Sequence, residues 1–242
     1  DVLNAFRGKA IPDPTGPDMK QKPKKKVDPF KSDPGEPLLS VCLIARNEEN
    51  YIEQCLRSVK RVADEIVLVD TGSTDRTVEL ARKYTDRIYV HPWRDSFSEA
   101  RNHYLAYARG KWIFQIDADE ELVPEDAPLV RRALTDPETD AVTVQIMSYS
   151  RQGRGRGVHC VERIFRNDGV IHYEGRVHNR LVGVKNPSLS RIRLLHYGYD
   201  LGKGTSETKF QRTEGLLKKD LEENPGDPYT HHYLSCSYLS RG

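Results

Sequence analysis

The segment Leu38-Leu-Ser-Val-Cys-Leu-Ile-Ala45 is a nearly continuous apolar run, which is typical of a strand covered on both faces. Apolar residues then recur at helical spacing from Tyr51 to Val62. Three more strand patterns follow, with amphipathic segments between them: Glu65-Ile-Val-Leu-Val-Asp70, Arg87-Ile-Tyr-Val90 and Lys111-Trp-Ile-Phe-Gln-Ile116. This alternation predicts an α/β fold with a mostly parallel, Rossmann-like sheet that has helices on both faces.

Further patterns complete the fold prediction. The segment Ser96-Phe-Ser-Glu99 fits a capping box and predicts a helix that runs to about Ala108. Apolar and polar residues alternate over 141–147 and 161–165, which indicates antiparallel strands added to the sheet. A polar helix is expected over 206–223, and helical residues continue beyond it. We therefore predict an antiparallel C-terminal extension followed by a short helical tail.

The first 37 residues differ in composition from the rest. They hold seven of the 14 prolines and the lysine-rich run Lys20-Gln-Lys-Pro-Lys-Lys-Lys26. So few apolar residues cannot offset the entropy lost on ordering, which predicts a flexible leader over 1–37. The run is expected to be a solvated tail, with peripheral contact to a membrane surface or another acidic partner as the alternative. We place the α/β domain at 38–205 and the C-terminal helices at 206–242.

The charge balance and the cysteines restrict the function classes. The 242 residues include 38 basic and 36 acidic ones, for a net charge of +2, so nucleic acid is not an expected partner. No apolar run approaches the roughly 18 residues that a membrane helix needs, and the start of the chain has no signal-peptide core. The 4 cysteines lie far apart without a CxxC motif, which favours a reducing, cytoplasmic location.

Acidic residues follow three of the predicted strands. The segments are Ala45-Arg-Asn-Glu-Glu49, Asp70-Thr-Gly-Ser-Thr-Asp75 and Asp117-Ala-Asp-Glu-Glu121. Ligands of an open parallel sheet bind at the carboxyl ends of its strands, so these segments are expected to converge on one crevice. Adjacent carboxylates repel one another unless they share a cation, and oxygen ligands favour Mg²⁺ or Mn²⁺ completed by substrate phosphates. The alternative for 117–121 is a solvated acidic turn.

Other nucleotide-binding classes fit the sequence less well. No G-x-G-x-x-G follows the first predicted strand, which argues against a dinucleotide enzyme. A nucleotidyltransferase is an alternative, because it uses a similar sheet and an acidic metal site. It requires a glycine-rich and basic loop after the first strand, however, and Ala45-Arg-Asn-Glu-Glu49 is acidic.

Seven motifs occur in order along the chain and carry a family resemblance. The first four resemble those of family 2 glycosyltransferases of the GT-A fold: Ser40-Val-Cys-Leu-Ile-Ala-Arg-Asn-Glu-Glu49, Val69-Asp-Thr-Gly-Ser-Thr-Asp75, Phe97-Ser-Glu-Ala-Arg-Asn102 and Trp112-Ile-Phe-Gln-Ile-Asp-Ala-Asp-Glu120. The last three resemble a bacterial subgroup with C-terminal tetratricopeptide repeats, related to peptide S-glycosyltransferases: Arg163-Ile-Phe-Arg-Asn167, Tyr173-Glu-Gly-Arg-Val-His178 and His196-Tyr-Gly-Tyr199. The resemblance covers about residues 38–242.

The resemblance implies a binding site for a nucleotide-sugar donor, with UDP as the expected nucleotide. Arg46, Asn47 and Glu48 are expected to line the nucleoside pocket. Asp70 is expected to hydrogen-bond the base, a uracil, and Arg101 to reach the uridine or the diphosphate. The acceptor expected from the family is a glycan, a lipid-linked sugar or a peptide side chain.

The resemblance also implies a site for Mn²⁺ or Mg²⁺. Asp119 is expected to bind the ion directly, and Asp117 to face the ribose or the ion. His196 is expected to complete the metal or diphosphate site, with His178 as the rival residue. The ion would offset the charge that grows on the diphosphate leaving group. Direct attack by the acceptor on the opposite side would invert the anomeric centre.

The catalytic base is the point at which this chain departs from the family pattern. Relatives commonly carry His-Glu where this chain has His178-Asn179, and Asn179 cannot take a proton. Glu174 or His178 is then expected to act as base. A thiol acceptor with a low pKa would lessen the need for one. The alternative function is a catalytically degenerate GT-A domain that binds nucleotide sugars or acts as a scaffold.

The end of the chain has a repeat-like pattern. The segment from Pro225 to Gly242 resembles the first helix of a tetratricopeptide unit. Such units bury their apolar faces against neighbouring repeats. We therefore expect the C-terminal helices to begin a tetratricopeptide-like unit.

Overall fold

The computed structural model describes residues 35–148, 157–198 and 203–239. The predicted leader over 1–37, including its lysine-rich run, thus lies almost wholly outside the described residues. The proposed division of the chain at residues 205 and 206 stays a prediction.

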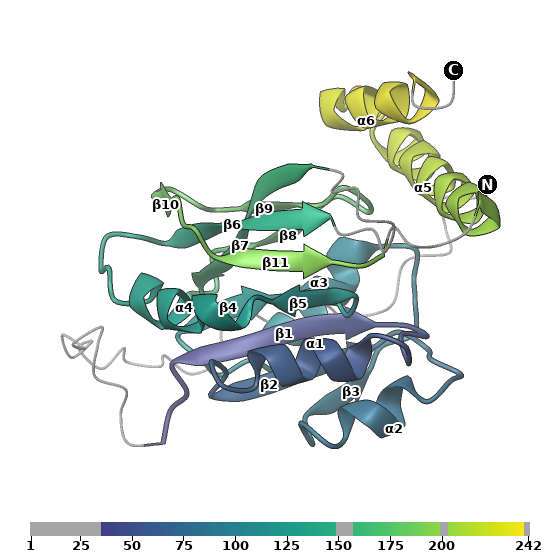
Figure 1. Cartoon of the computed structure of the whole chain (residues 1–242). Helices are drawn as coiled ribbons and strands as arrows, with labels where there is room; N and C mark the ends of the chain where they lie inside the picture. Colours follow the sequence, from purple (N-terminus) through teal and green to yellow (C-terminus); the bar gives the residue numbers. More distant parts are fainter. Residues whose placement is uncertain (1–34, 149–156, 199–202, 240–242) are drawn as a thin grey trace, which may run out of the picture. The chain divides into compact units, whose positions relative to one another are not determined.

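The described residues form one large sheet, a separate two-stranded sheet and helices around them (Figure 1). The strands of the large sheet are β1 (Leu39–Ala45), β2 (Glu65–Asp70), β3 (Ile88–Val90), β4 (Trp112–Gln115), β5 (Glu120–Leu122), β6 (Ala141–Ser148), β7 (Val158–Arg166), β10 (Pro187–Ser188) and β11 (Arg193–His196). The small sheet pairs β8 (His172–Glu174) with β9 (Arg180–Val182). The helices are α1 (Ile52–Val59), α2 (Thr77–Ala81), α3 (Phe97–Leu105), a 3₁₀ turn (Pro124–Asp126), α4 (Ala127–Ala133), α5 (Lys203–Glu223) and α6 (Pro228–Leu239).

The large sheet has a parallel half and a mixed half. Its order is β3-β2-β1-β4-β7-β6-β11-β5, with β10 paired to β6. The first four strands are parallel, as their apolar runs predict. β7 then runs antiparallel to both β4 and β6, which confirms the antiparallel extension. The predicted α/β fold class is therefore confirmed.

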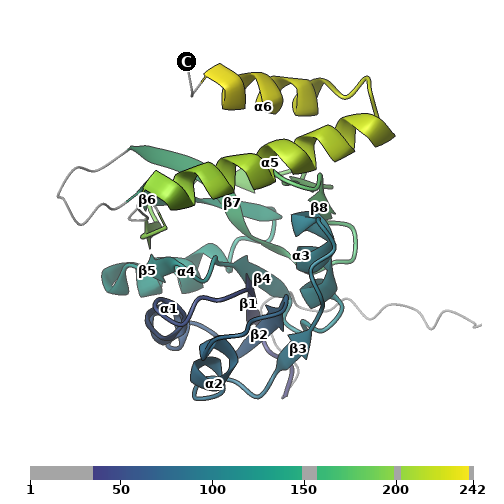
Figure 2. The ribbon, with the colours of Figure 1, turned by 90° about the vertical axis from the view of Figure 1, so that its right-hand side faces the viewer.

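Two hydrophobic cores lie on opposite faces of this sheet. Leu43 of β1 packs into the core that includes Leu56 of α1 and Val130 of α4. The adjacent Cys42 points to the other face, into the core that includes Tyr104 of α3. This alternation follows from the two-residue period of a strand. Figure 2 accordingly shows α1 and α3 on opposite sides of β1 and β2.

Helix α3 begins where the capping box predicts. Ser96 has extended backbone angles, and its hydroxyl oxygen accepts a hydrogen bond of 3.1 Å from the Glu99 backbone N–H. The cap fixes the first turn of α3 close to the carboxyl ends of the parallel strands. Arg101 lies just beyond that turn, so the cap helps to position its side chain.

The short strands β5 and β11 have no clear signal in the sequence. The residues of β5 read as an acidic turn, and no strand is predicted over 193–196. In the structure these two strands pair antiparallel, with His196 opposite Glu120. β11 also runs parallel to β6. The pairing brings the end of β11 beside the loop that follows β4.

The C-terminal helices α5 and α6 pack against each other. Figure 2 shows α5 running across the edge of the molecule at which the parallel strands end. The predicted polar helix over 206–223 is confirmed, with its start at Lys203. In the described part of the chain, no helix is both long and apolar enough to cross a lipid bilayer.

Candidate active site

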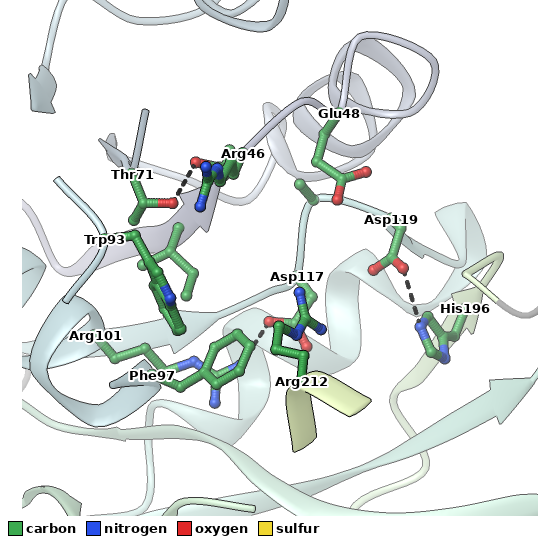
Figure 3. A pocket seen from close by; sticks show the side chains of 13 residues that line it. Arg46, Glu48, Thr71, Trp93, Phe97, Arg101, Asp117, Asp119, His196 and Arg212 are labelled. Atoms are coloured by element: carbon green, nitrogen blue, oxygen red, sulfur yellow. Dashed lines mark hydrogen bonds and ion pairs between the residues drawn. The ribbon is translucent and has the colours of Figure 1, made fainter. Parts of the chain in front are cut away.

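A cavity of about 320 Å³, which we call the main cavity, lies at the carboxyl ends of the parallel strands (Figure 3). Six residues predicted for the donor and metal sites line it: Arg46, Glu48, Arg101, Asp117, Asp119 and His196. The loops after β1 and β4 converge there, as the sheet topology predicts. Four further lining residues were not singled out from the sequence: Thr71, Trp93, Phe97 and Arg212.

Asn47 joins two loops beside the main cavity but is absent from its lining. Its backbone N–H donates to Ser73 Oγ at 3.0 Å, and its Oδ1 accepts from the Thr74 N–H at 2.8 Å. Its φ is 57°, a left-handed conformation that asparagine tolerates better than most residues. Asn47 thus fixes the loop that carries Arg46 and Glu48.

Asp70 also lies behind the lining. It is 4% exposed, and its carboxylate accepts hydrogen bonds of 3.1 Å from the backbone N–H groups of Gly72 and Ser73. Gly72 has a φ of 110°, which few residues with a side chain adopt. The carboxylate therefore closes the turn after β2, and the adjacent Thr71 is the residue that reaches the cavity.

Asp117 is held between two arginines. Its Oδ1 accepts from Arg101 Nη2 at 2.7 Å and from Gln115 Nε2 at 2.8 Å, and its Oδ2 accepts from Arg163 Nη2 at 3.0 Å. Burial opposes ionisation, but the charges and hydrogen bonds of Arg163 and Arg101 outweigh it and hold the Asp117 pKa well below its usual range. The charge of this carboxylate is thus neutralised by the protein itself.

Glu120 is a buried carboxyl that the sequence prediction placed in a metal-binding turn. Its Oε1 accepts from Arg163 Nη2 at 2.8 Å, and its Oε2 accepts from the Asp117 backbone N–H at 2.8 Å. Burial raises the pKa of Glu120 to about 7, with the Asp117 charge adding to the rise against the opposing charge of Arg163. Glu120 therefore titrates near neutral pH and shapes the loop that carries Asp117 and Asp119.

Asp119 and His196 contact each other on one side of the main cavity (Figure 3). Asp119 Oδ2 lies 3.2 Å from His196 Nε2. Burial lowers the pKa of His196, but the hydrogen bond and charge of Asp119 reverse the effect and raise it above its ordinary value. Gly198 makes room for the pair, because a Cβ there would lie 2.1 Å from Asp119 Oδ2 and 2.9 Å from His196 Nε2.

These residues fit a divalent cation that depends on its substrate for most of its ligands. One carboxylate and one imidazole are close enough to share an ion, and oxygen and nitrogen ligands suit Mn²⁺. Within residues 35–148, 157–198 and 203–239, no three His, Cys, Asp or Glu side chains are grouped to hold an ion alone. Asp117 has both oxygens on arginine and glutamine donors, so Asp119 and His196 are the better candidates.

Glu174 and His178, the two predicted bases, lie outside the main cavity lining. Both line a cavity of about 270 Å³ between the β8–β9 hairpin and the C-terminal helices. Glu174 carboxylate oxygens lie 3.3 Å from Arg180 Nη2 and 3.5 Å from His172 Nε2. The structure therefore does not bring Glu174 together with the acidic loop after β4.

His178 also lines a third cavity of about 530 Å³, which it shares with Arg101 and Asn179. Its ring stacks on Tyr233 of α6, with centroids 4.2 Å apart. Burial lowers the pKa of His178, which keeps its imidazole neutral near neutral pH. Because Arg101 lines both this third cavity and the main cavity, it forms part of the wall between them.

Asn179 lies outside the described lining of the main cavity and hydrogen-bonds to Arg101, which is part of that lining. Its Oδ1 accepts a hydrogen bond of 2.6 Å from Arg101 Nη1, while Arg101 Nη2 binds Asp117. Asn179 Nδ2 is buried and has no hydrogen-bond partner in the described structure. At this position, therefore, an amide oxygen holds the site arginine.

The comparisons with known proteins agree with this geometry. Residues 40–180 match the family model described as Glycosyl transferase family 2. The match spans more than half of the chain and includes Arg46, Arg101 and Asp119. The chain belongs to glycosyl transferase family 2, as its motifs predict.

Two curated relatives match most of this chain. A TPR repeat-containing protein of Synechococcus elongatus is 32% identical over 216 residues, covering 84% of this chain and 53% of that protein. The SPbeta prophage-derived glycosyltransferase SunS of Bacillus subtilis is 29% identical over 199 residues, covering 79% of this chain and 47% of SunS. The chain thus spans about half the length of these relatives.

Two solved structures share the fold. Staphylococcus aureus TarS in complex with UDP-GlcNAc superposes with a TM-score of 0.52 at 17% identity, covering 81% of this chain and 70% of TarS. Glucosyl-3-phosphoglycerate synthase from Mycobacterium tuberculosis, in complex with Mn²⁺ and UDP-Glc, superposes with a TM-score of 0.51 at 20% identity, covering 76% of this chain and 78% of the synthase. The likeness concerns the fold, which is the predicted GT-A fold.

Proposed function

We propose that the chain is a metal-dependent, inverting glycosyltransferase that uses a UDP-sugar donor. The observation that carries the proposal is the main cavity, where Asp119 and His196 lie 3.2 Å apart and which Arg46 and Arg101 also line. This arrangement offers cation ligands next to cationic groups, the combination that a diphosphate requires. The choice of UDP is supported by the structural neighbours solved with UDP-GlcNAc and UDP-Glc.

The protein groups divide the work of donor binding. Trp93 and Phe97 form an aromatic wall, with ring centroids 4.8 Å apart, on which a nucleoside can rest. Asp117 holds Arg101 in place, so the guanidinium is oriented before substrate arrives. Asp119 and His196 would hold Mn²⁺ or Mg²⁺. When bound, such an ion offsets the negative charge that develops on a diphosphate leaving group.

We assign the acceptor to the third cavity and the role of catalytic base to His178. The third cavity adjoins the main cavity through Arg101, so an acceptor there would approach the donor from another side. His178 lines it with a neutral imidazole, which can take the proton of an attacking hydroxyl or thiol. Attack from the side opposite the leaving diphosphate inverts the anomeric centre. The acceptor classes are those of the family: a glycan, a lipid-linked sugar or a peptide side chain.

The C-terminal helices are proposed to begin a tetratricopeptide-like unit. They form a packed helix pair, and the Synechococcus relative is named a TPR repeat-containing protein. Tyr238 and Leu239 of α6 are 47% and 80% exposed, in keeping with a helix that packs on a further repeat.

A panel of nucleotide sugars tested by thermal shift provides the experiment. Ligands that bind the native state raise its apparent melting temperature. UDP-sugars with Mn²⁺ are expected to raise it more than GDP-, CMP- or dTDP-sugars do. Equal or absent shifts across the panel would refute the donor assignment, and binding without turnover would identify a degenerate domain.

A further inference from the structure

The main cavity includes a cationic side chain from the C-terminal helix α5. Arg212 belongs to α5, which lies beyond the residues that match the family model. Its side chain lines the main cavity, and Figure 3 shows it there beside Phe97 and Asp117. The Arg212 Cζ atom lies 5.5 Å from the centroid of the Phe97 ring. No motif in the sequence singles this arginine out.

The position of Arg212 is fixed by the packing of α5. Leu216 and Lys219 follow Arg212 at spacings of four and seven residues, so all three lie on one face of the helix. Leu216 is 3% exposed, and Lys219 forms an ion pair with Asp95 in the loop before α3. This face of α5 therefore docks on the segment that supplies the aromatic wall.

A second contact holds the same helix from the β8–β9 hairpin. Arg176 Nε lies 3.1 Å from Asp220 Oδ1 of α5. The carbonyl oxygen of Arg176 accepts a hydrogen bond of 2.7 Å from the Phe97 backbone N–H at the start of α3. Arg176 thus ties α5 to the helix that carries Arg101. The geometry makes α5 a fixed wall of the main cavity.

Two guanidinium groups in this cavity form no ion pair with a carboxylate of the described residues. Arg101 is neutralised by Asp117 at 2.7 Å. For Arg46 and Arg212, no carboxylate of a described residue lies within ion-pair distance. Partial desolvation of the guanidinium lowers the pKa of Arg212, the like charge of Arg46 lowers it further, and the charge of Glu48 opposes the shift. Like charges held around one cavity favour a bound anion between them.

We propose that Arg212 binds the diphosphate of the donor opposite Arg46, so that the C-terminal helix α5 completes the donor site. The inference rests on the proposed function and extends it to a residue outside the matched domain. The planar guanidinium presents paired donors that match phosphate oxygens, which a lysine reproduces only in charge. The nucleoside is proposed to rest on Trp93 and Phe97 without an ionic contact to Arg212, so its binding is expected to depend on this charge much less than diphosphate binding does.

Titration calorimetry in the presence of Mn²⁺ tests the proposal. Four versions of the whole chain are compared: wild type, Arg212→Gln, Arg212→Lys and Lys218→Gln. Lys218 is the control, because it is exposed on the same helix and pairs with Glu214. The ligands are UDP, inorganic diphosphate and uridine. Arg212→Gln is expected to weaken UDP and diphosphate binding by about 10- to 100-fold and uridine binding by less than about twofold. The affinity of Arg212→Lys for UDP and diphosphate is expected to lie between those of wild type and Arg212→Gln. Lys218→Gln is expected to bind both ligands as wild type does.

The outcomes separate the two proposals. If wild type binds UDP and Arg212→Gln binds it equally well, the Arg212 assignment is overturned while the proposed function stands. If UDP and uridine binding fall by the same factor, the loss is not at the diphosphate and the assignment is again overturned. If wild type binds no UDP, both the proposed function and the Arg212 assignment are refuted. Arg212 is exposed, so the variant is expected to melt at the wild-type temperature.

Discussion

Asp119 Oδ2 lies 3.2 Å from His196 Nε2, although 77 positions separate the two residues in the chain. The contact exists because β11 pairs with β5 and so ends beside the loop after β4. It puts one carboxylate and one imidazole in a cavity that also holds arginines. The proposed metal site depends on this pair.

Gly198 should be required for the pair. A methyl group there would lie 2.1 Å from Asp119 Oδ2, so Gly198→Ala must displace that carboxylate or the imidazole. We expect Mn²⁺-dependent UDP binding to weaken by about tenfold or more, measured by calorimetry with and without the ion. Gly215→Ala is the matched control, because a Cβ at Gly215 meets nothing within 4 Å. Equal Mn²⁺ dependence in both variants would refute the role given to Gly198.

The pH dependence of Mn²⁺ binding should follow His196. Its pKa lies above the ordinary value of about 6.5, because Asp119 stabilises the protonated form. A protonated imidazole cannot bind a cation, so Mn²⁺-dependent UDP affinity should fall as pH falls through this raised pKa. His196→Gln should abolish that pH dependence. An unchanged pH profile in the variant would show that another group titrates.

The raised pKa of His196 has the opposite effect on the stability of the ion-free protein, which should fall rather than rise as pH increases. The His196–Asp119 ion pair contributes stability fully below the unfolded pKa of about 6.5 and loses it as pH rises through the folded pKa. Chemical denaturation of wild type and His196→Gln, with a chelator present, measures the difference. The gap between the two free energies of unfolding should narrow as pH rises from below about 6.5 through the raised folded pKa.

Glu120 should make the fold less stable as pH rises toward neutrality. Its pKa is about 7 in the fold, against an ordinary value near 4.3, so the folded state binds a proton that the unfolded state has lost. The free energy of unfolding should therefore fall as pH rises from the unfolded pKa toward the folded pKa. Glu120→Gln should flatten the profile, whereas Glu125→Gln, at an exposed carboxylate, should keep the wild-type slope. Equal slopes in all three proteins would contradict the assignment.

The catalytic base can be tested with two variants. His178→Gln should lower UDP-sugar hydrolysis without acceptor by about 100-fold or more, while UDP affinity stays within about twofold. Glu174→Gln should change turnover little, because Glu174 lies outside both the main cavity and the third cavity. Tyr233→Leu is the control for the packing of the two rings, because it removes the ring stacked on His178 but keeps the imidazole. Loss of turnover in Glu174→Gln alone would move the role of base to Glu174.

The central strands and the acidic loop were predictable from sequence for a physical reason. A strand covered on both faces must be apolar throughout, so β1, β2 and β4 leave long apolar runs. Functional groups must then lie where such strands end. That logic finds Asp117 and Asp119 without any structure.

The rest of the site depends on contacts between distant segments. β5 and β11 have three and four residues, too short for a periodic pattern, so only the family resemblance pointed to His196. Arg212 lies on a mostly polar helix whose orientation is set by Leu216 and Lys219. The sequence also did not predict the partners of Asp117, because Arg163 contacts it from the distant strand β7.

Calorimetric titration of UDP into wild type and Asp119→Asn, each with Mn²⁺ and with chelator, tests the central claim most directly. Asp86→Asn, an exposed aspartate, is the control. The account predicts that Mn²⁺ strengthens UDP binding at least tenfold in wild type and in Asp86→Asn, and does nothing in Asp119→Asn. UDP binding that Mn²⁺ strengthens equally in all three proteins would contradict it.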